Sequence, residues 1–463
     1  MRLLNFAWRF HGTQGAGRGA THREGSRGLQ PVCGGGGGPV GLRGVFPGGG
    51  NPVGAPGRRR PVVRGVASAA AFMVHTWQMR TFGVEEEFLI VDPVNGVPLP
   101  LSAEVMRLHG AGGPSAGQVL SAELHQEQLE VITHPHGTLA GLAAEILAGR
   151  AHADSLARTA GARIVALATS PLALTPHPTR NERYDALVEK YALTAREQLT
   201  CGLHVHVSVG SDEEGVAVLD RIRSWLPPLM ALSSNSPFWN GRDSGYASFR
   251  TQAWNRWSSA GPMEVFGSAR AYHSLVADLS ATGVVVNPDF DARLSARHPT
   301  VEIRVSDVCL DPRDTVLIAA LVRALVETAA REWESGKEPD GVPAIILRQG
   351  VWMASRWGLR GELLHPATHR PDTARRVIAA LHDHVRDALE ESGDGAYVEE
   401  ALERILENGT GAARQRQAHV RHGRLADVVT HAIALTHQEP AGHHPSGNGS
   451  PSWTWKPLAE AVV

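Results

Sequence analysis

Apolar positions around residues 81–92 predict a strand, and three consecutive acids interrupt it. Because strand side chains alternate between faces, Glu85 and Glu87 point to one face and Glu86 to the other. Two carboxylates on one rigid face suit a divalent cation with oxygen ligands, and a buried strand would need such a cation to neutralise them. The competing interpretation is an edge strand whose acids are simply solvated.

The rest of the pattern mixes strands with amphipathic helices. Further strands are expected at 128–133, 163–168, 200–209 and 300–306. Apolar spacings of three and four residues predict helices at 139–159, 182–197, 214–226, 229–234, 315–334, 344–357, 373–391, 398–407 and 425–436, with a polar, tryptophan-rich loop at 235–257. Strands separated by helices, several of them with charged alternation, predict an α+β fold. We expect a curved sheet with one polar, functional face rather than a doubly wound parallel sheet.

Composition is that of an ordinary globular protein. The 463 residues are 42% hydrophobic and 20% charged, which is enough to bury a large core. The formal net charge of -2 hides a basic start, because residues 1–72 carry ten arginines and a single acid, Glu24. The remainder is acidic, which argues against a nucleic-acid partner. No uninterrupted apolar run reaches the about 18 residues of a transmembrane helix, so no membrane association is expected.

These shifts in composition divide the chain into three segments. Residues 1–72, rich in Gly, Arg and Pro, are expected to form a disordered arm. A transit peptide would share the arginines, but the favoured interpretation is a start codon placed too early, with Met73 or Met79 as the true beginning. A catalytic domain is expected at 73–437 and a flexible tail at 438–463.

The cysteines indicate a reducing compartment. Cys33, Cys201 and Cys309 are too few and too scattered for a disulfide framework, and no Cys-x-x-Cys pair offers a zinc site. The cytoplasm is therefore the expected location. Nothing near Cys201 predicts a depressed pKa, so a small buried thiol is favoured over a nucleophile at that position.

Four expected strands carry ionisable residues on one face. Many carboxylates with one or two imidazoles favour Mg²⁺ or Mn²⁺ over Zn²⁺, and Mg²⁺ commonly serves a phosphorylated substrate. A guanidinium in such a site would bind phosphate oxygens in a fork. Spacing alone also permits two structural interpretations. Glu123 and Glu127 could lie on a solvated helix face, and Glu302 and Arg304 could form a local ion pair. The residues are Glu85 and Glu87, Glu130 with Glu123 and Glu127 upstream, His204 and His206, and Glu302 and Arg304.

The same segments resemble a known family. They are similar, in order and spacing, to the strand motifs of the type 2 glutamate-cysteine ligases, also called carboxylate-amine ligases. The loop Ser248-Phe-Arg-Thr-Gln-Ala-Trp254 resembles that family's arginine and tryptophan segment, and the resemblance covers about 81–437. The strand segments are Gly83-Val-Glu-Glu-Glu-Phe88, Gln128-Leu-Glu-Val-Ile-Thr133, Gly202-Leu-His-Val-His-Val207 and Val301-Glu-Ile-Arg-Val-Ser-Asp307.

The resemblance implies a glutamine-synthetase-like fold, in which an antiparallel sheet curls into a funnel flanked by helices and Mg²⁺ and ATP meet at its wide face. It implies ATP-dependent amide formation. The γ-carboxylate of glutamate would be phosphorylated, and an amine, with cysteine the usual acceptor, would attack the acyl phosphate. The expected partners are these small molecules, and a homo-oligomer is compatible with the resemblance. The sequence does not identify the acceptor.

The resemblance also assigns residues. Glu302 and Arg304 would be catalytic, with Arg304 steadying the transferred phosphoryl group. His206 and Arg250 would join Arg304 in binding ATP or substrate. Which of the two histidines, His204 or His206, is the metal ligand stays open. Either Glu123 or Glu127 would be the acid upstream of Glu130, and Glu123 has the family's spacing of seven residues. The metal ligands would be Glu85, Glu87, Glu130, Glu302, His204 and Glu123.

Two rival functions stay open on the sequence. A metal-dependent amidohydrolase would use His204-x-His206 and nearby carboxylates to hold zinc and activate water. A catalytically silent homologue would only bind a nucleotide or an amino acid. Two further predictions concern neighbours of the site. Glu86, on the far face, should be the most replaceable of the three acids, and Trp225, Trp239, Trp254 and Trp257 should be packing residues.

Overall fold

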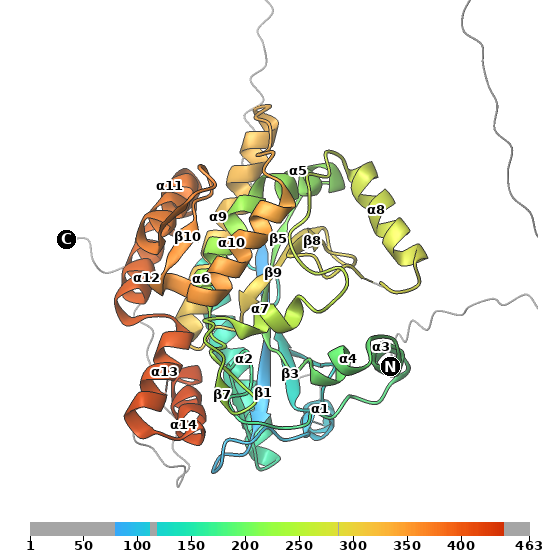
Figure 1. Ribbon diagram of the computed structural model, residues 1–463, viewed down its shortest axis with the longest axis vertical. Coiled ribbons are helices and arrows are strands. Elements are labelled where there is room, and N and C mark those ends of the chain that lie inside the picture. Colours follow the sequence, from blue (N-terminus) through green and yellow to red (C-terminus); the bar gives the residue numbers. More distant parts are fainter. Residues whose placement is uncertain (1–78, 112–117, 286, 439–463) are drawn as a thin grey trace, which may run out of the picture. The chain divides into compact units, whose positions relative to one another are not determined.

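The computed structural model describes residues 79–111, 118–285 and 287–438 (Figure 1). These residues fall within one compact unit. The predicted arm at 1–72 lies outside the described residues, and so does the predicted tail apart from Gln438. Of the helices that the structure describes, none is both long and apolar enough to cross a membrane.

A seven-stranded antiparallel sheet forms the framework (Figure 1). The strand order is β2-β3-β1-β5-β9-β8, and β4 pairs with the last three residues of β1. The path is open rather than closed into a barrel, and helices cover the sheet, so the predicted α+β class is confirmed. The strands are β1 (Phe82–Val91), β2 (Val119–Ala122), β3 (Gln128–Ile132), β4 (Arg163–Val165), β5 (Gly202–Ser208), β8 (Ala292–Leu294) and β9 (Thr300–Asp307).

One face of this sheet is apolar and carries the main core. Val84, Val205 and Ile303 lie opposite one another on β1, β5 and β9 and are at most 1% exposed. Helices α2 (Leu139–Thr159) and α9 (Pro312–Glu334) pack against this face and contribute to the same cluster. Because side chains alternate along each strand, burying this face directs the intervening residues to the opposite one.

Shorter elements surround the sheet. Two hairpins, β6 (Phe238–Trp239) with β7 (Arg242–Asp243) and β10 (Glu362–Leu364) with β11 (Pro371–Thr373), lie outside it. The remaining helices are α1 (Ser102–Ala111), α3 (Glu182–Tyr191), α4 (Leu193–Glu197), α5 (Asp212–Ile222), η1 (Arg223–Trp225), α6 (Leu226–Ser233), α7 (Phe249–Trp254), α8 (Ala269–Ala281), α10 (Ala344–Trp357), η2 (Gly358–Arg360), α11 (Ala374–Ser392), α12 (Gly395–Asn408), α13 (Gly411–His422) and α14 (Leu425–Thr436).

Several sequence predictions differ from the structure. The helix expected at 182–197 is two helices, because Ala192 adopts a φ of 49° between α3 and α4. The loop expected at 235–257 contains the β6–β7 hairpin and α7, which Ser248 caps by accepting a hydrogen bond from the Thr251 N–H. Both elements are too short for a repeating apolar pattern to reveal them. The strand expected at 163–168 ends at residue 165, and α1, α8, α13, β2 and β8 were not predicted.

Candidate active site

Two ladder pairs gather acids on the polar face of the sheet. Glu87 on β1 lies directly opposite Glu130 on β3, and Glu85 lies opposite His204 on β5. Directly opposed residues share a face, so these four side chains point the same way. Glu87 Oε2 accepts a hydrogen bond of 2.6 Å from the Gly202 N–H, which fixes that carboxylate at the start of β5. The shared face predicted for Glu85, Glu87 and Glu130 is present.

These carboxylates repel one another. Burial, and then the charges of the neighbouring acids, hold the pKa of Glu130 well above its usual range. Burial and the charge of Glu87 raise the pKa of Glu123 to about 8. Burial alone would also raise the pKa of Glu85, but hydrogen bonds to two facing histidines outweigh it and lower that pKa. Crowded carboxyl groups with raised pKa values indicate a site that a cation would stabilise.

The structure also separates the two upstream acids. Glu127 is fully buried, with Oε1 2.6 Å from His177 Nδ1, and it accepts hydrogen bonds from the His177 N–H. By contrast, the charges of Glu87 and Glu85 raise the pKa of Glu123. Glu123 therefore belongs to the acidic cluster, and Glu127 fixes the segment around His177 instead.

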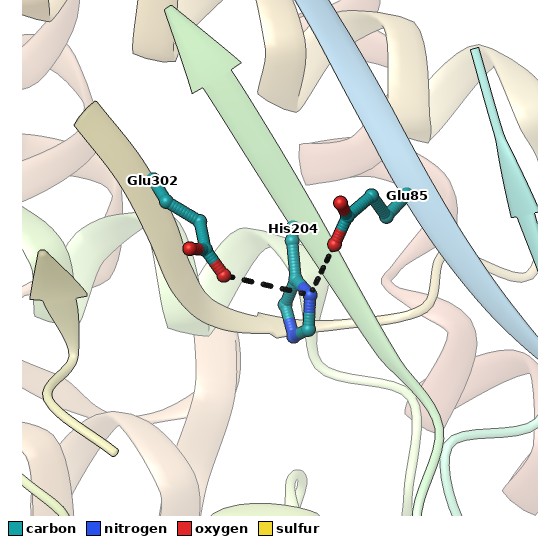
Figure 2. A group of neighbouring side chains, drawn as sticks. All are labelled: Glu85, His204 and Glu302. Atoms are coloured by element: carbon teal, nitrogen blue, oxygen red, sulfur yellow. Dashed lines mark hydrogen bonds and ion pairs between the residues drawn. The ribbon is translucent and has the colours of Figure 1, made fainter. Parts of the chain in front are cut away.

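His204 lies between two carboxylates (Figure 2). Its Nδ1 is 3.0 Å from Glu85 Oε2 and 4.0 Å from Glu302 Oε1. Its Nε2 is buried and has no hydrogen-bond partner among the described residues. Burial and a nearby arginine lower the pKa of His204, which favours the neutral form that binds metals. His206 Nδ1 lies 3.0 Å from Thr300 Oγ1 and its Nε2 3.3 Å from Glu85 Oε1, so both nitrogens of His206 face a polar neighbour.

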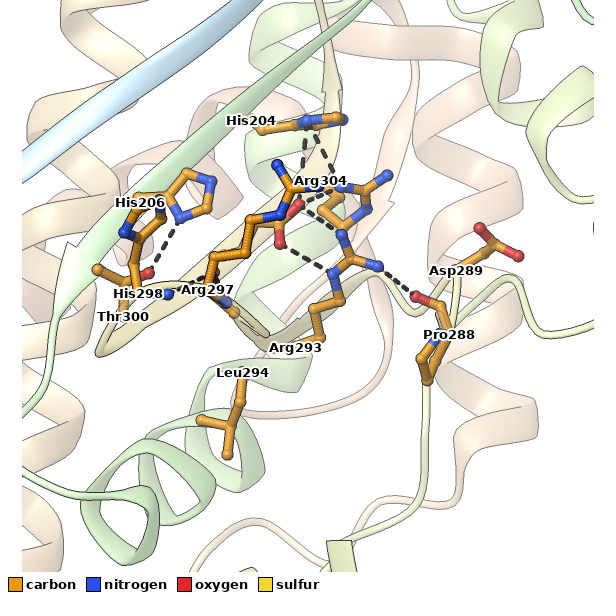
Figure 3. A network of polar contacts seen from close by, with 12 residues as sticks. His204, His206, Pro288, Asp289, Arg293, Leu294, Arg297, His298, Thr300 and Arg304 are labelled. Atoms are coloured by element: carbon orange, nitrogen blue, oxygen red, sulfur yellow. Dashed lines mark hydrogen bonds and ion pairs between the residues drawn. The ribbon is translucent and has the colours of Figure 1, made fainter. Parts of the chain in front are cut away.

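Two arginines, Arg293 and Arg304, lie side by side in Figure 3, and both bind Glu302 on the same face. Arg293 on β8 lies opposite Glu302 in register and donates to it from Nε at 2.8 Å and from Nη2 at 3.1 Å. Arg304, two residues along β9, donates from Nη1 to Glu302 Oε1. Burial opposes ionisation, but the charges of Arg304 and Arg293 outweigh it and lower the pKa of Glu302 to about 2. Sequence reasoning missed Arg293, because the three-residue strand β8 is too short to show alternation.

Helix α7 places two more residues beside Arg304. Arg250 is 2% exposed, and its Nη2 donates to the Arg304 carbonyl at 3.3 Å. The Trp254 ring lies 5.4 Å from Arg250 Cζ and 5.3 Å from Arg304 Cζ, so this tryptophan packs, as predicted, but against the arginines of the site. Arg250 supports Arg304 in this structure, and its predicted contact with substrate or phosphate stays a prediction.

The surroundings of Glu86 argue against the prediction that it is the most replaceable of the three acids. Glu86 does face away from the other two, but it is 2% exposed. Arg150 on α2 donates to its two oxygens at 3.0 and 2.5 Å, and Thr315 Oγ1 donates at 2.6 Å. A buried ion pair that loses one partner leaves an uncompensated charge, so this position tolerates change poorly.

The residues fit a divalent cation. Two sets of three potential ligand atoms lie within 4.8 Å of one another, Glu85, His204 and Glu302 in one and Glu87, Glu130 and His204 in the other. Carboxylate oxygens predominate and the orphaned Nε2 of His204 adds a nitrogen, a donor set that suits a divalent cation. The polar face is thus divided: carboxylates without an arginine partner in the described part of the chain lie on β1 and β3, arginines lie beside Glu302 on β8 and β9, and the histidines of β5 lie between them.

Comparison with known proteins gives the class. The model of glutamate-cysteine ligase family 2 matches residues 81–431, and the chain belongs to this family. A Paenarthrobacter aurescens (strain TC1) protein, provisionally named glutamate–cysteine ligase 2-1, is 53% identical over 366 residues, which are 78% of this chain and 95% of that protein. A Streptomyces coelicolor relative with the provisional name glutamate–cysteine ligase 2 is 51% identical over 361 residues, 77% of this chain and 99% of its own length.

Solved structures agree on the fold. The crystal structure of glutamate–cysteine ligase from Francisella tularensis in complex with AMP gives a TM-score of 0.54 at 14% identity, covering 78% of this chain and 90% of that one. A bifunctional glutathione synthetase from Pasteurella multocida gives 0.53 at 16% identity, covering 78% and 52%. At such identities the likeness shows the fold alone, and it confirms the predicted fold. The family match, together with this shared fold, identifies the chain as an ATP-dependent carboxylate-amine ligase.

Proposed function

We propose that this ligase phosphorylates the γ-carboxylate of glutamate with ATP and transfers the acyl group to the amine of a second small molecule, with cysteine as one acceptor. The observation that supports this most directly is the division of charge on the polar face. Phosphoryl transfer needs carboxylates that hold metal ions next to cations that hold phosphate oxygens. The acidic cluster on β1 and β3 and the arginines of β8 and β9 supply both within one surface.

The acidic half would hold the metal. Glu85, Glu87, Glu130 and Glu123, with His204 Nε2, are the proposed ligands for Mg²⁺, and Mn²⁺ suits the same donors. A bound Mg²⁺ would neutralise the charge of the phosphates. Without a cation, burial and mutual repulsion favour protonation of Glu123 and Glu130.

The cationic half would orient the reacting groups. Arg304 is proposed to donate hydrogen bonds to the transferred phosphoryl oxygens, and Glu302 fixes the orientation of Arg304 and also lies within reach of the metal ligands. His206 is proposed to contact ATP or substrate. The acyl phosphate forms by direct transfer from ATP, so no protein nucleophile is needed, and positioning and electrostatics supply the catalysis.

The rival functions receive less support. The family match and the structural likeness favour a ligase over a zinc amidohydrolase. Glu302 also has both oxygens bound by arginines, an arrangement better suited to phosphate recognition than to water activation. A cytoplasmic location is also proposed, because Cys201 and Cys309 are buried free thiols and free thiols fit a reducing compartment.

The deciding experiment measures product formation by the purified chain with glutamate, MgATP and a panel of amines that includes cysteine and hydroxylamine. ADP, phosphate and an amide should appear only when glutamate and an amine are both present. Hydrolysis of an amide without ATP, or no product with any amine, would overturn the proposal. Glu87→Gln should abolish turnover, whereas Glu189→Gln, at an exposed position on α3, should not. An unchanged rate in Glu87→Gln would refute the metal assignment.

A further inference from the structure

The hairpin of helices α3 and α4 packs loosely beside the site, and the proposed reaction gives it no role. None of the ten residues of α3 is buried, and the helix lies at the periphery of the molecule (Figure 1). It belongs to a small hydrophobic cluster, separate from the main core, whose buried members are Leu124, Ala195 and Trp257. Elements held by so few buried apolar groups open at a low cost in free energy. The hairpin is therefore suited to movement.

The first turn of α3 is tied to the acidic half of the polar face. The Tyr184 hydroxyl donates a hydrogen bond of 3.3 Å to the carbonyl of Ala122, the residue before Glu123. Just upstream of the helix, Thr179 donates from its hydroxyl to the Glu123 carbonyl at 2.7 Å and from its N–H to the Leu124 carbonyl at 2.8 Å. The backbone that carries Glu123 is thus bound to the chain that leads into α3.

The last turn of α3 reaches the cationic half. The rings of Tyr191 and Trp257 meet edge to face, with their centroids 4.7 Å apart. Trp257 shares its hydrophobic cluster with Trp254, whose ring lies 5.3 Å from Arg304 Cζ. The helix therefore spans the distance from the residue before Glu123 to the tryptophans beside Arg304. Its two ends rest on the two halves of the polar face.

A strained residue marks the point where α3 can turn. Ala192, between the two helices, has a φ of 49° and a ψ of -118°, a conformation that residues with a side chain rarely adopt. The hydrogen bonds that hold the adjacent end of α3 are exposed. Lys190 donates from Nζ to the Gly283 carbonyl at 2.5 Å, and the Tyr191 hydroxyl lies 3.1 Å from Ser258 Oγ. Water can replace both contacts at little net cost.

From these contacts we propose that α3 is a lid, which opens at Ala192 to admit MgATP and glutamate and closes over the polar face when they are bound. The inference rests on the proposed function and deepens it, because it identifies the element that protects the acyl phosphate from water. Without protection, a water oxygen bonds to the acyl carbon and the C–O bond to phosphate breaks. Phosphate leaves with that electron pair, and the protons of water pass to solvent or phosphate. ATP is then consumed without an amide, and a closed lid prevents this by excluding water.

Ligand binding favours the closed position. The two segments on which α3 rests carry groups of the proposed site, Glu123 in one and Trp254 beside Arg304 in the other. Ligands that hold both segments in place stabilise the docked helix, and the docked helix in turn strengthens ligand binding. The inner face of α3 contributes Leu187 and Val188 to the cluster. These apolar side chains keep water out on the side that faces the site.

The first test measures how tightly ATP consumption is coupled to amide formation. The double variant Leu187→Ala with Val188→Ala weakens the seat of α3, so the ratio of ADP to amide with glutamate, MgATP and cysteine should rise roughly tenfold. Glu189→Gln, on the exposed side of the same helix, is the matched control and should keep the wild-type ratio. Retained ADP formation shows that the double variant folds and makes the acyl phosphate. An unchanged ratio, or an equal loss of ADP and amide, would overturn the lid.

The second test follows the opening directly. Hydrogen exchange of the backbone amides at 182–197 is measured in the full chain, without ligands and with Mg²⁺, glutamate and a non-hydrolysable ATP analogue. Saturating ligands should slow exchange in this segment roughly 10- to 100-fold. Helix α12, which packs on α9 and α11, is the internal reference and should not change. Protection of the strands without protection of α3 would overturn the lid. If no segment is protected and the wild type forms no ADP, the proposed function itself fails.

Discussion

Arg293 and Glu302 face each other across the β8–β9 ladder, and one guanidinium fork binds both oxygens of the glutamate, at 2.8 and 3.1 Å. Arg293 Nη1 also donates to the Pro288 carbonyl at 2.8 Å, so its own orientation is fixed. Arg304 donates to the same glutamate. Arg293 therefore positions Glu302, and through it Arg304, without having to touch the substrate.

Replacing Arg293 should impair turnover more than folding. Arg293→Ala is expected to lower kcat by roughly 10- to 100-fold, the effect usual for residues that orient the groups around a metal site. Arg293→Lys keeps the charge but loses the fork, so only part of the rate should return. Steady-state kinetics with ATP as the varied substrate measure both variants, with Arg270→Ala on the exposed side of α8 as the control. A kcat that stays at the wild-type level in Arg293→Ala would contradict this role.

The acidic cluster predicts how stability depends on pH in the metal-free protein. Folding raises the pKa of Glu123 from 4.5 to about 8, so the folded state binds more protons than the unfolded state between these values. Stability should therefore fall as the pH rises through this window. Glu85 acts with the opposite sign, because its lowered pKa stabilises the protein above 4.5 and that contribution is lost in acid.

Chemical unfolding at a series of pH values tests this dependence. Glu123→Gln should flatten the decline between about 4.5 and about 8. Added Mg²⁺ should stabilise the protein because the ion binds only the folded state. The gain in stability should be largest at the upper end of the pH window, where the carboxyl groups ionise readily. A decline that is as steep in Glu123→Gln as in the wild type would assign the pH dependence to other groups.

Glu86 should matter for stability rather than for chemistry. Glu86→Gln leaves the Arg150 guanidinium buried without its counter-ion, so the free energy of unfolding should fall by about 3–5 kcal/mol. Denaturant titration measures the loss. Glu104→Gln removes an acid that is paired on the exposed surface of α1, and its loss of stability should be much smaller. Similar losses in the two variants would mean that the Arg150 pair contributes no more than a surface ion pair.

Cys201 should be dispensable for catalysis. The residue is fully buried, and burial followed by the charge of Glu87 raises the pKa of its thiol well above the ordinary value. A thiol in that state is a poor nucleophile. Cys201→Ser should retain kcat, and thiol-alkylating reagents should not inactivate the folded enzyme. Loss of activity in the variant at unchanged thermal stability would give Cys201 a chemical role.

The sequence predicted the parts of the site that lie within long strands. The alternation of Glu85 with Glu87 and of Glu302 with Arg304 was readable because β1 and β9 are eight or more residues long. Arg293 was not readable, since only the register with β9 reveals its neighbour Glu302. Ladder pairing depends on contacts between residues far apart in sequence, which a local pattern cannot encode.

Glu86 illustrates the same limit more sharply. Strand alternation assigned its face correctly, but its partner Arg150 is 64 positions away and Thr315 is 229 positions away. Only the packing of α2 and α9 against the sheet brings these groups to the carboxylate. Without those distant partners in view, its place outside the active site led to the prediction that Glu86 is the most replaceable of the three acids.

The ion pair between Glu86 and Arg150 on the apolar face has a consequence for how the chain aligns as it folds. Sliding β1 by one residue would turn Glu85 and Glu87 into the core and Glu86 out of it. Arg150 offers one guanidinium there, so a misaligned strand would bury a second carboxylate with no cation to match it. The three adjacent acids thus help to fix the register of β1. Only one pairing of β1 with its neighbouring strands buries a single carboxylate of the three beside the one guanidinium that can neutralise it.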